Sequence, residues 1–393
     1  MLILNARLVL FAVLGCFIST HVQAIVFPKN GGAGQGIYNT NFSVQADGTV
    51  KTWGALNYDS PPATQLVPAI YTGLANVKMV SGVSFVKNDG TVWKIPFGGS
   101  SFLNKPANQV PIYNVTKIAE SHLHTIALKS DGTVWGWGDN QQGELGIGSF
   151  TYDEQTPVQA IGLTGIIDVS AGGSNSRSSY ALKSDGTVYA WGGNEYGQFG
   201  NGGTCGSPFC GIPTPTLIPG LTGVLQIASG YTHTVALKSD GTVWAAGGAF
   251  GVNFRQIAGL NNVVAIAAGQ YSSMALKNDG SVWSFSNSNN PIASVVSGLM
   301  NIQSIEYTEG GAIAFATSTN GTVYLWGNGY LGNGTSNGSD SPVILGEIAP
   351  TPPPSSEIHQ VPALSESWLL IMLIATIMIS FTVQMKLKKS GGC

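Results

Sequence analysis

The sequence predicts an all-β protein, a seven-bladed β-propeller built from four-stranded antiparallel blades. Two observations predict this fold: a short hairpin motif occurs seven times, and a second strand-forming segment lies between the copies. The composition agrees, because 53 of the 393 residues are glycine and only 9% are charged. This composition favours many short strands joined by tight turns over helices or disorder.

The hairpin motif is Asp-Gly-Thr-Val or a close variant, as in SDGTVWGWG at residues 130–138. An Asp-Gly or Asn-Gly pair favours a type I′ turn between antiparallel strands, in which both turn residues have positive φ. We therefore expect a structural role for the first residue of each pair. These residues are Asp47, Asp89, Asp131, Asp185, Asp240, Asp279 and Asn320, at spacings of 42, 42, 54, 55, 39 and 41 residues.

The second element is a strand, a Gly-Leu turn and another apolar strand, as in PVQAIGLTGIIDVSAGG at residues 157–173. Two strands from this segment and two from the hairpin give four strands per unit. Seven such units close into a ring, which limits the number of exposed strand edges. Only SPVILGEI at 341–348 follows the last hairpin, so we expect an apolar N-terminal strand at 25–28 to share a blade with it.

The repeats resemble those of the regulator-of-chromosome-condensation family. Residues 118–148 and 179–203 carry the resemblance, including a Gly-x-Asn-x-x-Gly-x-Leu-Gly loop after the hairpin. It extends from about residue 37 to 346 and implies the seven-bladed propeller. The family includes a secreted bacterial β-lactamase inhibitor and a eukaryotic guanine-nucleotide exchange factor. Exchange activity is not expected here, because the chain is acidic, carries an export signal and lacks a basic nucleosome-binding arm.

Residues 1–24 are typical of a signal peptide: Arg7 precedes an apolar run, and a small-x-small site allows cleavage after Ala24. The propeller is predicted to occupy residues 25–348, and a Pro-rich linker occupies 349–360. We expect export across the inner membrane of a Gram-negative bacterium, to the envelope, the cell surface or the medium.

Residues 361–393 are similar to the Ile-Pro-Thr-Leu-type sorting signals that exosortase-like enzymes process in Gram-negative bacteria. An apolar run at 368–383 predicts a membrane helix, and the lysines after it predict a cytoplasmic C-terminus. A plain C-terminal membrane anchor is the alternative. The residues that match the sorting motif are Val361, Pro362, Leu364, Ser365 and Glu366.

The sequence predicts no catalytic, cofactor or metal site. Residues 25–360 contain 13 basic and 19 acidic residues, a net charge of −6, which argues against nucleic-acid binding. His124 and His233 occupy the same position in their repeats. We interpret Ser179 and Ser273 as the residues at this position in two other copies. A histidine repeated in register is expected to bond a neighbouring blade rather than a metal.

The two longest spacings place extra residues in 139–157 and 193–215, and insertions in repeat proteins often lie on the binding face. Alternatively, these are the family's ordinary full-length loops, and the other units are shortened. The candidate binding residues at the loop rim are Tyr152, Tyr196, Phe209, Glu144 and Glu195. Cys205 and Cys210 are predicted to form a disulfide in the oxidising compartment reached after export.

The leading functional hypothesis is an exported module, anchored at the surface or released, that binds an unknown extracellular protein or glycan without catalysis. The alternative is an extracellular enzyme that acts on polysaccharide at the propeller face. That enzyme would need a pair of carboxylates, for which Glu144 and Glu195 are the candidates.

Overall fold

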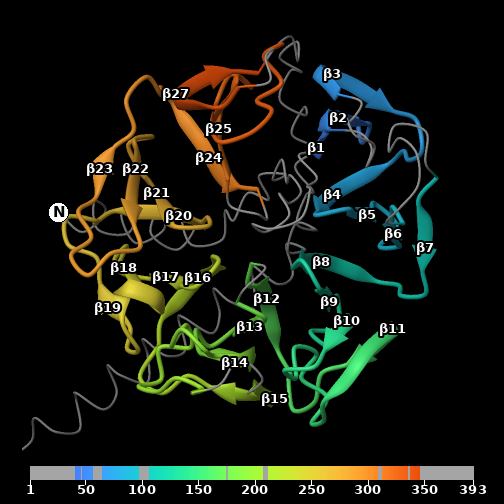
Figure 1. Cartoon of the computed structure of the whole chain (residues 1–393), viewed down its shortest axis with the longest axis vertical. Helices are drawn as coiled ribbons and strands as arrows, with labels where there is room; N and C mark the ends of the chain where they lie inside the picture. Colours follow the sequence, from blue (N-terminus) through green and yellow to red (C-terminus); the bar gives the residue numbers. More distant parts are fainter. Residues whose placement is uncertain are drawn as a thin grey trace, which may run out of the picture. The chain divides into compact units, whose positions relative to one another are not determined.

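Seven antiparallel sheets follow one another along the chain and are arranged around a common centre (Figure 1). The computed structural model describes residues 40–345 except 46, 56–63, 97–105, 174–175, 207–210, 309–311 and 335–336. These sheets confirm the predicted seven-bladed propeller. The predicted signal peptide, strand 25–28, linker, sorting signal and membrane helix lie outside the described residues. Within residues 40–345, no described helix is long and apolar enough to cross a membrane.

The sheets are numbered here as blades 1 to 7 in chain order. Blade 1 contains β1 (Thr40–Val44), β2 (Val50–Ala55) and β3 (Thr64–Tyr71). Blade 2 contains β4 (Val77–Ser81), β5 (Ser84–Lys87), β6 (Val92–Lys94) and β7 (Asn108–Val110). Blade 3 contains β8 (Val115–Glu120), β9 (His124–Lys129), β10 (Val134–Asn140) and β11 (Thr151–Gln159). Blade 4 contains β12 (Ile166–Ala171), β13 (Ser178–Lys183), β14 (Val188–Gly193) and β15 (Gly211–Leu217).

The remaining blades have the same order, with the first strand nearest the centre of the ring (Figure 1). Blade 5 contains β16 (Val224–Ser229), β17 (Thr234–Lys238), β18 (Val243–Ala246) and β19 (Arg255–Gln256), with a 3-10 helix, η2 (Gly248–Phe250), before β19. Blade 6 contains β20 (Val263–Ala268), β21 (Ser272–Lys277), β22 (Val282–Ser286) and β23 (Ser294–Val295). Blade 7 contains β24 (Ile302–Tyr307), β25 (Ile313–Ser318), β26 (Val323–Gly327) and β27 (Ser339–Ile344).

The repeated hairpin turn differs from the expected type I′ turn. Lys129 N donates to Thr133 O at 2.9 Å and Gly132 N to Lys129 O at 3.0 Å, so the loop has three residues. This is a type I turn followed by a left-handed glycine, and only Gly132, at φ +78°, has positive φ. Asp131 causes the difference, because its Oδ1 accepts from both the backbone N and the hydroxyl of Thr133.

The hairpin turns all join the same two strands of their blades, which places them on one rim of the ring, here called the turn rim. Their backbone also contacts the following blade: Val77 N donates to Gly48 O and Val115 N to Gly90 O, both at 3.0 Å. A Cβ on Gly48 would lie 2.9 Å from the backbone of Asn76 in the next blade. The motif therefore closes one hairpin and positions the first strand of the next blade.

Blades 7 and 1 are joined by side-chain contacts and by a backbone bond from Gly334 N to Leu66 O at 3.0 Å. Among the described residues, blade 7 has four strands, all between 302 and 344, and the expected contribution of residues 25–28 stays a prediction because these residues lie outside the described part of the chain. Trp53 of blade 1 is fully buried, and its Nε1 donates to Tyr330 O at 3.1 Å. Its indole ring packs in one hydrophobic cluster with Ile313, Leu331 and Leu345 of blade 7.

The outer strands of four blades carry proline. Each proline lies where the register between the third and fourth strands shifts, so its missing N–H costs no ladder bond. These prolines are Pro68 in β3, Pro157 in β11, Pro213 and Pro215 in β15, and Pro342 in β27. The outer strands of the other three blades, β7, β19 and β23, have only two or three residues.

Replacing Gly132 by valine should lower the free energy of unfolding by about 2 kcal/mol. The left-handed conformation is unfavourable for L-residues and especially for β-branched ones, and a Cβ on Gly132 would lie 3.4 Å from Gly165 N. Urea unfolding of the full chain measures the change. The matched control is Gly203→Val, since Gly203 is exposed and lacks a positive φ. Equal losses in both variants would contradict the proposed role of the turn.

Candidate functional site

The loops that follow the third strands lie on the rim opposite the turn rim, because neighbouring strands in each blade are antiparallel. This opposite side is here called the loop face. In blades 3 and 4, its main elements are the β10–β11 and β14–β15 connections, which are the two long segments singled out in the sequence. The second is described as far as Gly206.

An asparagine organises each of these two loops. Asn140 Oδ1 accepts from Leu145 N at 2.9 Å, and Asn140 Nδ2 donates to Ser149 O at 3.0 Å. Asn194 repeats the pattern, with its Oδ1 accepting from Phe199 N at 3.0 Å. The loop glycine Gly146 has φ +70°, and a Cβ there would lie 2.9 Å from the indole nitrogen of Trp191. The Gly-x-Asn-x-x-Gly-x-Leu-Gly pattern is therefore explained by loop closure and by contact with the next blade.

A chain of hydrogen bonds joins the blade 3 loop to blade 4. Glu144 O accepts from Trp191 Nε1 at 2.7 Å and from Ser179 Oγ at 2.8 Å. Because Ser179 Oγ donates its proton there, it accepts from His124 Nε2, 2.8 Å away. This assigns the Nε2–H tautomer to His124, whose Nδ1 then accepts from Ser121 Oγ at 2.6 Å.

These bonds confirm that the repeated histidines are scaffold groups that bond a neighbouring blade. His233 repeats the contact, with its Nε2 2.7 Å from Ser273 Oγ. The interpretation of Ser179 and Ser273 as equivalents of the histidines is wrong by one residue. His124 pairs with Gly138, and it is Ser178 that pairs with the corresponding Gly192. The one-residue shift turns each serine to the opposite face of its strand, where it meets the histidine of the preceding blade.

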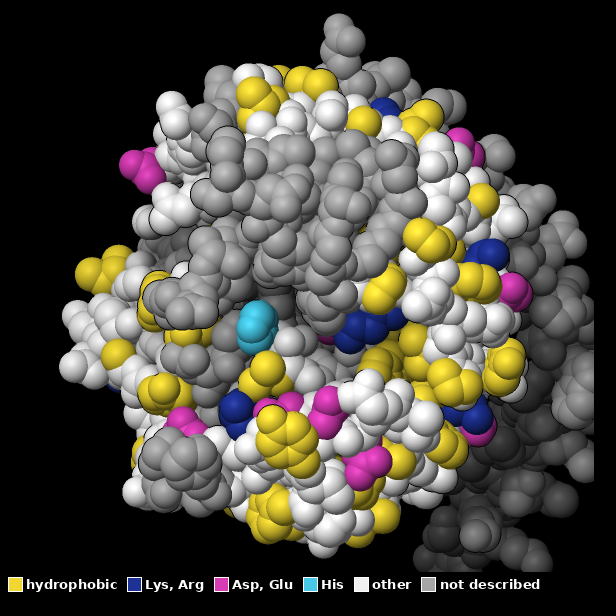
Figure 2. All heavy atoms as spheres, turned by 45° about the vertical axis from the view of Figure 1, so that its right-hand side comes forward, with side chains coloured by type: hydrophobic (Ala, Val, Ile, Leu, Met, Phe, Trp, Pro, Cys, Tyr) yellow, Lys and Arg dark blue, Asp and Glu magenta, His cyan; other side chains and the backbone are white. Residues whose placement is uncertain are grey.

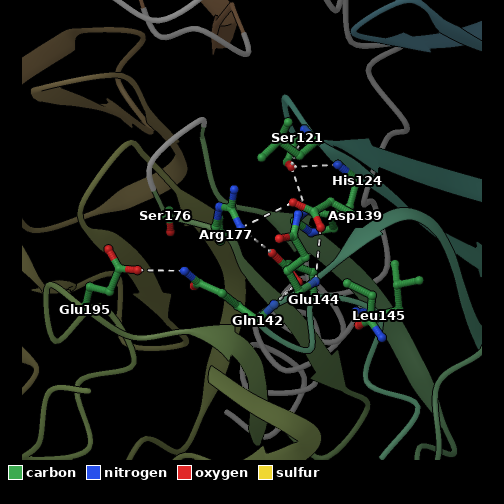
Figure 3. A network of polar contacts seen from close by, with 12 residues as sticks. Ser121, His124, Asp139, Gln142, Glu144, Leu145, Ser176, Arg177 and Glu195 are labelled. Atoms are coloured by element: carbon green, nitrogen blue, oxygen red, sulfur yellow. Dashed lines mark hydrogen bonds and ion pairs between the residues drawn. The ribbon is translucent and has the colours of Figure 1, made fainter. Parts of the chain in front are cut away.

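Arg177 lies between two acidic side chains of the blade 3 loop (Figure 3). Its Nη1 is 3.3 Å from Asp139 Oδ2 and 3.6 Å from Glu144 Oε1. Arg177 also has φ +44°, an unusual backbone conformation for a residue other than glycine or asparagine. On the other side of the loop, Gln142 Nε2 donates to Glu195 Oε1 at 2.7 Å. The network thus includes groups from both candidate loops and from the segment before β13.

Glu144 is fully buried and not at the loop rim, where the sequence analysis placed it. Its Oε2 accepts from Gln142 N at 2.8 Å, so the side chain folds back into its own loop. Burial raises the pKa of Glu144 to about 7, an effect that the bonds from backbone N–H groups and the charge of Arg177 oppose. Glu144 therefore has a structural role, and it does not form an open carboxylate pair with Glu195.

The predicted aromatic residues differ in their exposure. Tyr152, the second residue of β11, is 80% exposed, and the neighbouring Phe150, which the sequence analysis did not single out, is 53% exposed. Tyr196 is partly buried, and its N donates to Gln198 Oε1 at 2.9 Å. Phe209 lies outside the described residues. In Figure 2, hydrophobic and acidic side chains gather next to one another on the surface.

The predicted disulfide stays a prediction, because Cys210 lies outside the described residues. Cys205 is partly buried, and its N donates to Asn194 O at 3.0 Å, which ties this part of the β14–β15 loop to the organising asparagine. The described part of the chain contains no group of three His, Cys, Asp or Glu side chains placed to hold a metal ion.

Sequence reasoning missed Arg177, although this residue forms ion pairs with Asp139 and Glu144 of the loop. Arg177 stands in a segment where the repeat pattern is interrupted, so no equivalent position pointed to it. The feature of the sequence that could have indicated Arg177 is the scarcity of basic residues around it. The stretch from 134 to 217 contains only one other, Lys183, which forms an ion pair with Asp185 at the turn rim.

Residues 131–176 and 185–237 match the regulator of chromosome condensation (RCC1) repeat, and residues 115–144 and 166–198 match a second model of that repeat. The matched segments lie between residues 115 and 237, less than half of the chain. They include both loops of the candidate site, which agrees with the resemblance found in the sequence.

The curated relatives that match this chain are much longer than their matched segments. The E3 ubiquitin-protein ligase HERC2 of Homo sapiens is 30% identical over 220 residues, which cover 49% of this chain and 4% of that protein. Protein pim1 of Schizosaccharomyces pombe is 37% identical over 144 residues, which cover 35% of this chain and 26% of that protein. The chain therefore spans only a small part of these relatives.

Solved RCC1-type structures share the fold of this ring. Prp20p from Saccharomyces cerevisiae, described with its binding to Gsp1p and histones, has a TM-score of 0.64 and 19% identity, covering 78% of this chain and 88% of that one. Yeast RCC1 (Prp20) in complex with Kap60 has a TM-score of 0.65 and 18% identity, covering 84% and 86%. At these identities, the similarity shows the propeller fold alone.

Replacing Glu144 by glutamine should remove a pH dependence of stability. Because its pKa is raised from 4.5 to about 7, the folded state holds a proton there that the unfolded chain has released. The stability that Glu144 contributes is present below pH 4.5 and is lost as the pH rises to 7. The free energy of unfolding of Glu144→Gln should therefore rise relative to the wild type across this window, by roughly 3 kcal/mol.

Denaturant unfolding of both proteins between pH 4 and 8 measures this difference. Burial also lowers the pKa of His233 to about 4, so stability falls as the pH drops below 6.5, but this effect is common to both proteins and cancels. A difference that is constant over the whole range would contradict the buried position of Glu144.

Proposed function

We propose that the ring is a protein-binding module and that its binding surface is the loop face of blades 3 and 4. The observation that carries the proposal is a pair of exposed aromatic side chains, Phe150 and Tyr152, at the end of a loop held firmly in place. Asn140 closes this loop from within, and Trp191 and Ser179 hold it from the next blade. A fixed loop loses little conformational entropy on binding, and aromatic side chains are frequent binding hot spots.

The relatives support a binding role for a ring of this kind. The yeast propeller was described with its binding to Gsp1p and histones, and a complex with Kap60 was solved. For this chain we propose a protein partner other than those of the yeast propeller. A glycan is the second class of ligand to test. We also propose that the chain acts without catalysis, which the buried, ion-paired position of Glu144 favours over a polysaccharide-cleaving carboxylate pair.

We further propose that this binding takes place outside the cytoplasm. The signal peptide at 1–24 and the sorting-type tail at 361–393 support export, followed by anchoring at the envelope or release by an exosortase-like enzyme. N-terminal sequencing of the protein expressed in a Gram-negative host should begin at Ile25. A protein that retains Met1 and stays in the cytoplasmic fraction would contradict export but would leave the binding surface unaffected.

The binding proposal is tested with the purified full chain as bait against envelope proteins and a glycan array. Truncating both aromatic side chains, Phe150→Ala with Tyr152→Ala, should weaken capture of the identified partner about tenfold or more. The matched control is Ile292→Ala with Val295→Ala, which removes side chains that are 76% and 54% exposed in blade 6. Equal losses in both double variants, or no loss in either, would refute the proposed surface.

A further inference from the structure

The loop face of blades 3 and 4 has an excess of negative charge. The described loops and their flanking strand contain the carboxylates of Asp139, Glu144, Asp153, Glu154 and Glu195. Between residues 134 and 217 the chain has two basic residues, Arg177 and Lys183. Lys183 is engaged at the opposite rim, 3.0 Å from Asp185, so Arg177 is the one basic side chain available to the five acids.

Arg177 is already used inside the loop network. It lies between Asp139, which is 8% exposed, and the buried Glu144. The other three acids form no ion pair within the described residues. Glu195 and Asp153 accept hydrogen bonds only from neutral glutamines, Gln142 and Gln155. Three carboxylates, those of the exposed Asp153 and the half-buried Glu154 and Glu195, are therefore left without a counterion among the described residues.

Two of these carboxylates, Asp153 and Glu154, directly follow the exposed Tyr152 in β11, and Glu195 contacts the same loop through Gln142. Asp153 directly follows Tyr152 in β11 and is paired with Asp139 on β10, so two acidic residues stand opposite one another in the sheet. Like charges in such a pair repel unless a cation is near, and Arg177 is that cation for Asp139, at 3.3 Å, but forms no ion pair with Asp153. Figure 2 shows acidic side chains beside hydrophobic ones on this side of the ring.

We infer that the partner presents a basic segment to this surface, with lysine or arginine side chains against Asp153, Glu154 and Glu195. The inference rests on the proposed binding surface. An arginine is the best-fitting group, because its planar guanidinium pairs with carboxylates and also stacks on aromatic rings such as those of Tyr152 and Phe150. An acidic partner would meet three uncompensated like charges, so the same surface selects against it.

The test uses two labelled 12-residue peptides, one of alternating arginine and serine and one of alternating glutamate and serine, with the full chain. The arginine peptide should bind, and its affinity should fall as salt rises, since exposed charges are screened within about 10 Å at 0.1 M salt. The glutamate peptide should not bind. Equal binding of both peptides, or binding that is independent of salt, would overturn the inference.

Three substitutions assign the interaction to this surface. Asp153→Asn, Glu154→Gln and Glu195→Gln together should weaken binding of the arginine peptide about tenfold, as three ion pairs of modest strength at one exposed and two half-buried carboxylates predict. Two single variants are also compared, Glu154→Gln and Asp340→Asn. Asp340→Asn removes an exposed carboxylate from the outer strand of blade 7 and should leave binding of the arginine peptide unchanged. Thermal melting confirms that each variant is folded.

The outcomes separate this inference from the proposed function. Loss of partner capture in the Phe150 and Tyr152 double variant, with unchanged peptide binding in the charge variant, refutes the basic partner and leaves the binding surface standing. Peptide binding that falls in the Asp340→Asn control as much as in Glu154→Gln also refutes it, because the attraction is then not local. Weaker binding of the arginine peptide to the triple variant, with unchanged binding to Asp340→Asn, supports the inference of a basic partner.

Discussion

The position of the blade 3 and blade 7 loops depends on the bond from an indole N–H of one blade to a loop carbonyl of the blade before it. Trp191 holds the loop of blade 3 at Glu144, and Trp53 holds the loop of blade 7 at Tyr330 in the same way. Among the described residues, backbone bonds from each turn to the next blade, such as Val115 N to Gly90 O at 3.0 Å, act together with these side-chain contacts to position neighbouring blades. The bond from Trp53 also helps to join blades 7 and 1.

The same contacts explain the character of the loop face. A loop whose carbonyl is held by the next blade is fixed in position, and its own acidic side chain is drawn inward, where Arg177 and a backbone N–H receive it. Burial of Glu144 then raises its pKa, while the aromatic residues beyond the loop stay in solvent. Scaffold and candidate binding surface are therefore parts of one network.

The fold could be predicted from the sequence because its signals are local and repeated. Seven Asp-Gly or Asn-Gly pairs and the segments between them specify strands, turns and order along the chain. The turn type was predicted wrongly, because an aspartate that bonds the following threonine stabilises a three-residue loop instead of a two-residue one. The bond from Trp53 to Tyr330 O between blades 1 and 7 was not predicted, because the tryptophan and the loop carbonyl lie far apart in the sequence.

The candidate site was predictable only in outline. The two long spacings and Tyr152 indicated the right loops, because insertion length and aromatic type are visible in a sequence. The inward orientation of Glu144 was not predictable, since it depends on Gln142 N within the loop and on Arg177 from another blade. The exposure of Phe150 likewise follows from the end of β11, where the strand has no outer neighbour among the described residues.

The prolines of the outer strands have a consequence for how these rings behave when they are crowded together. Each blade ends in an edge strand, and a long regular edge is a template on which a second molecule can add a strand and start a cross-β assembly. Pro68, Pro157, Pro213 and Pro342 interrupt the longer edges at the same register shift, and the remaining edges are too short to act as templates. The perimeter therefore resists aggregation by strand addition, and the rings can be present at high density without polymerising through their edges.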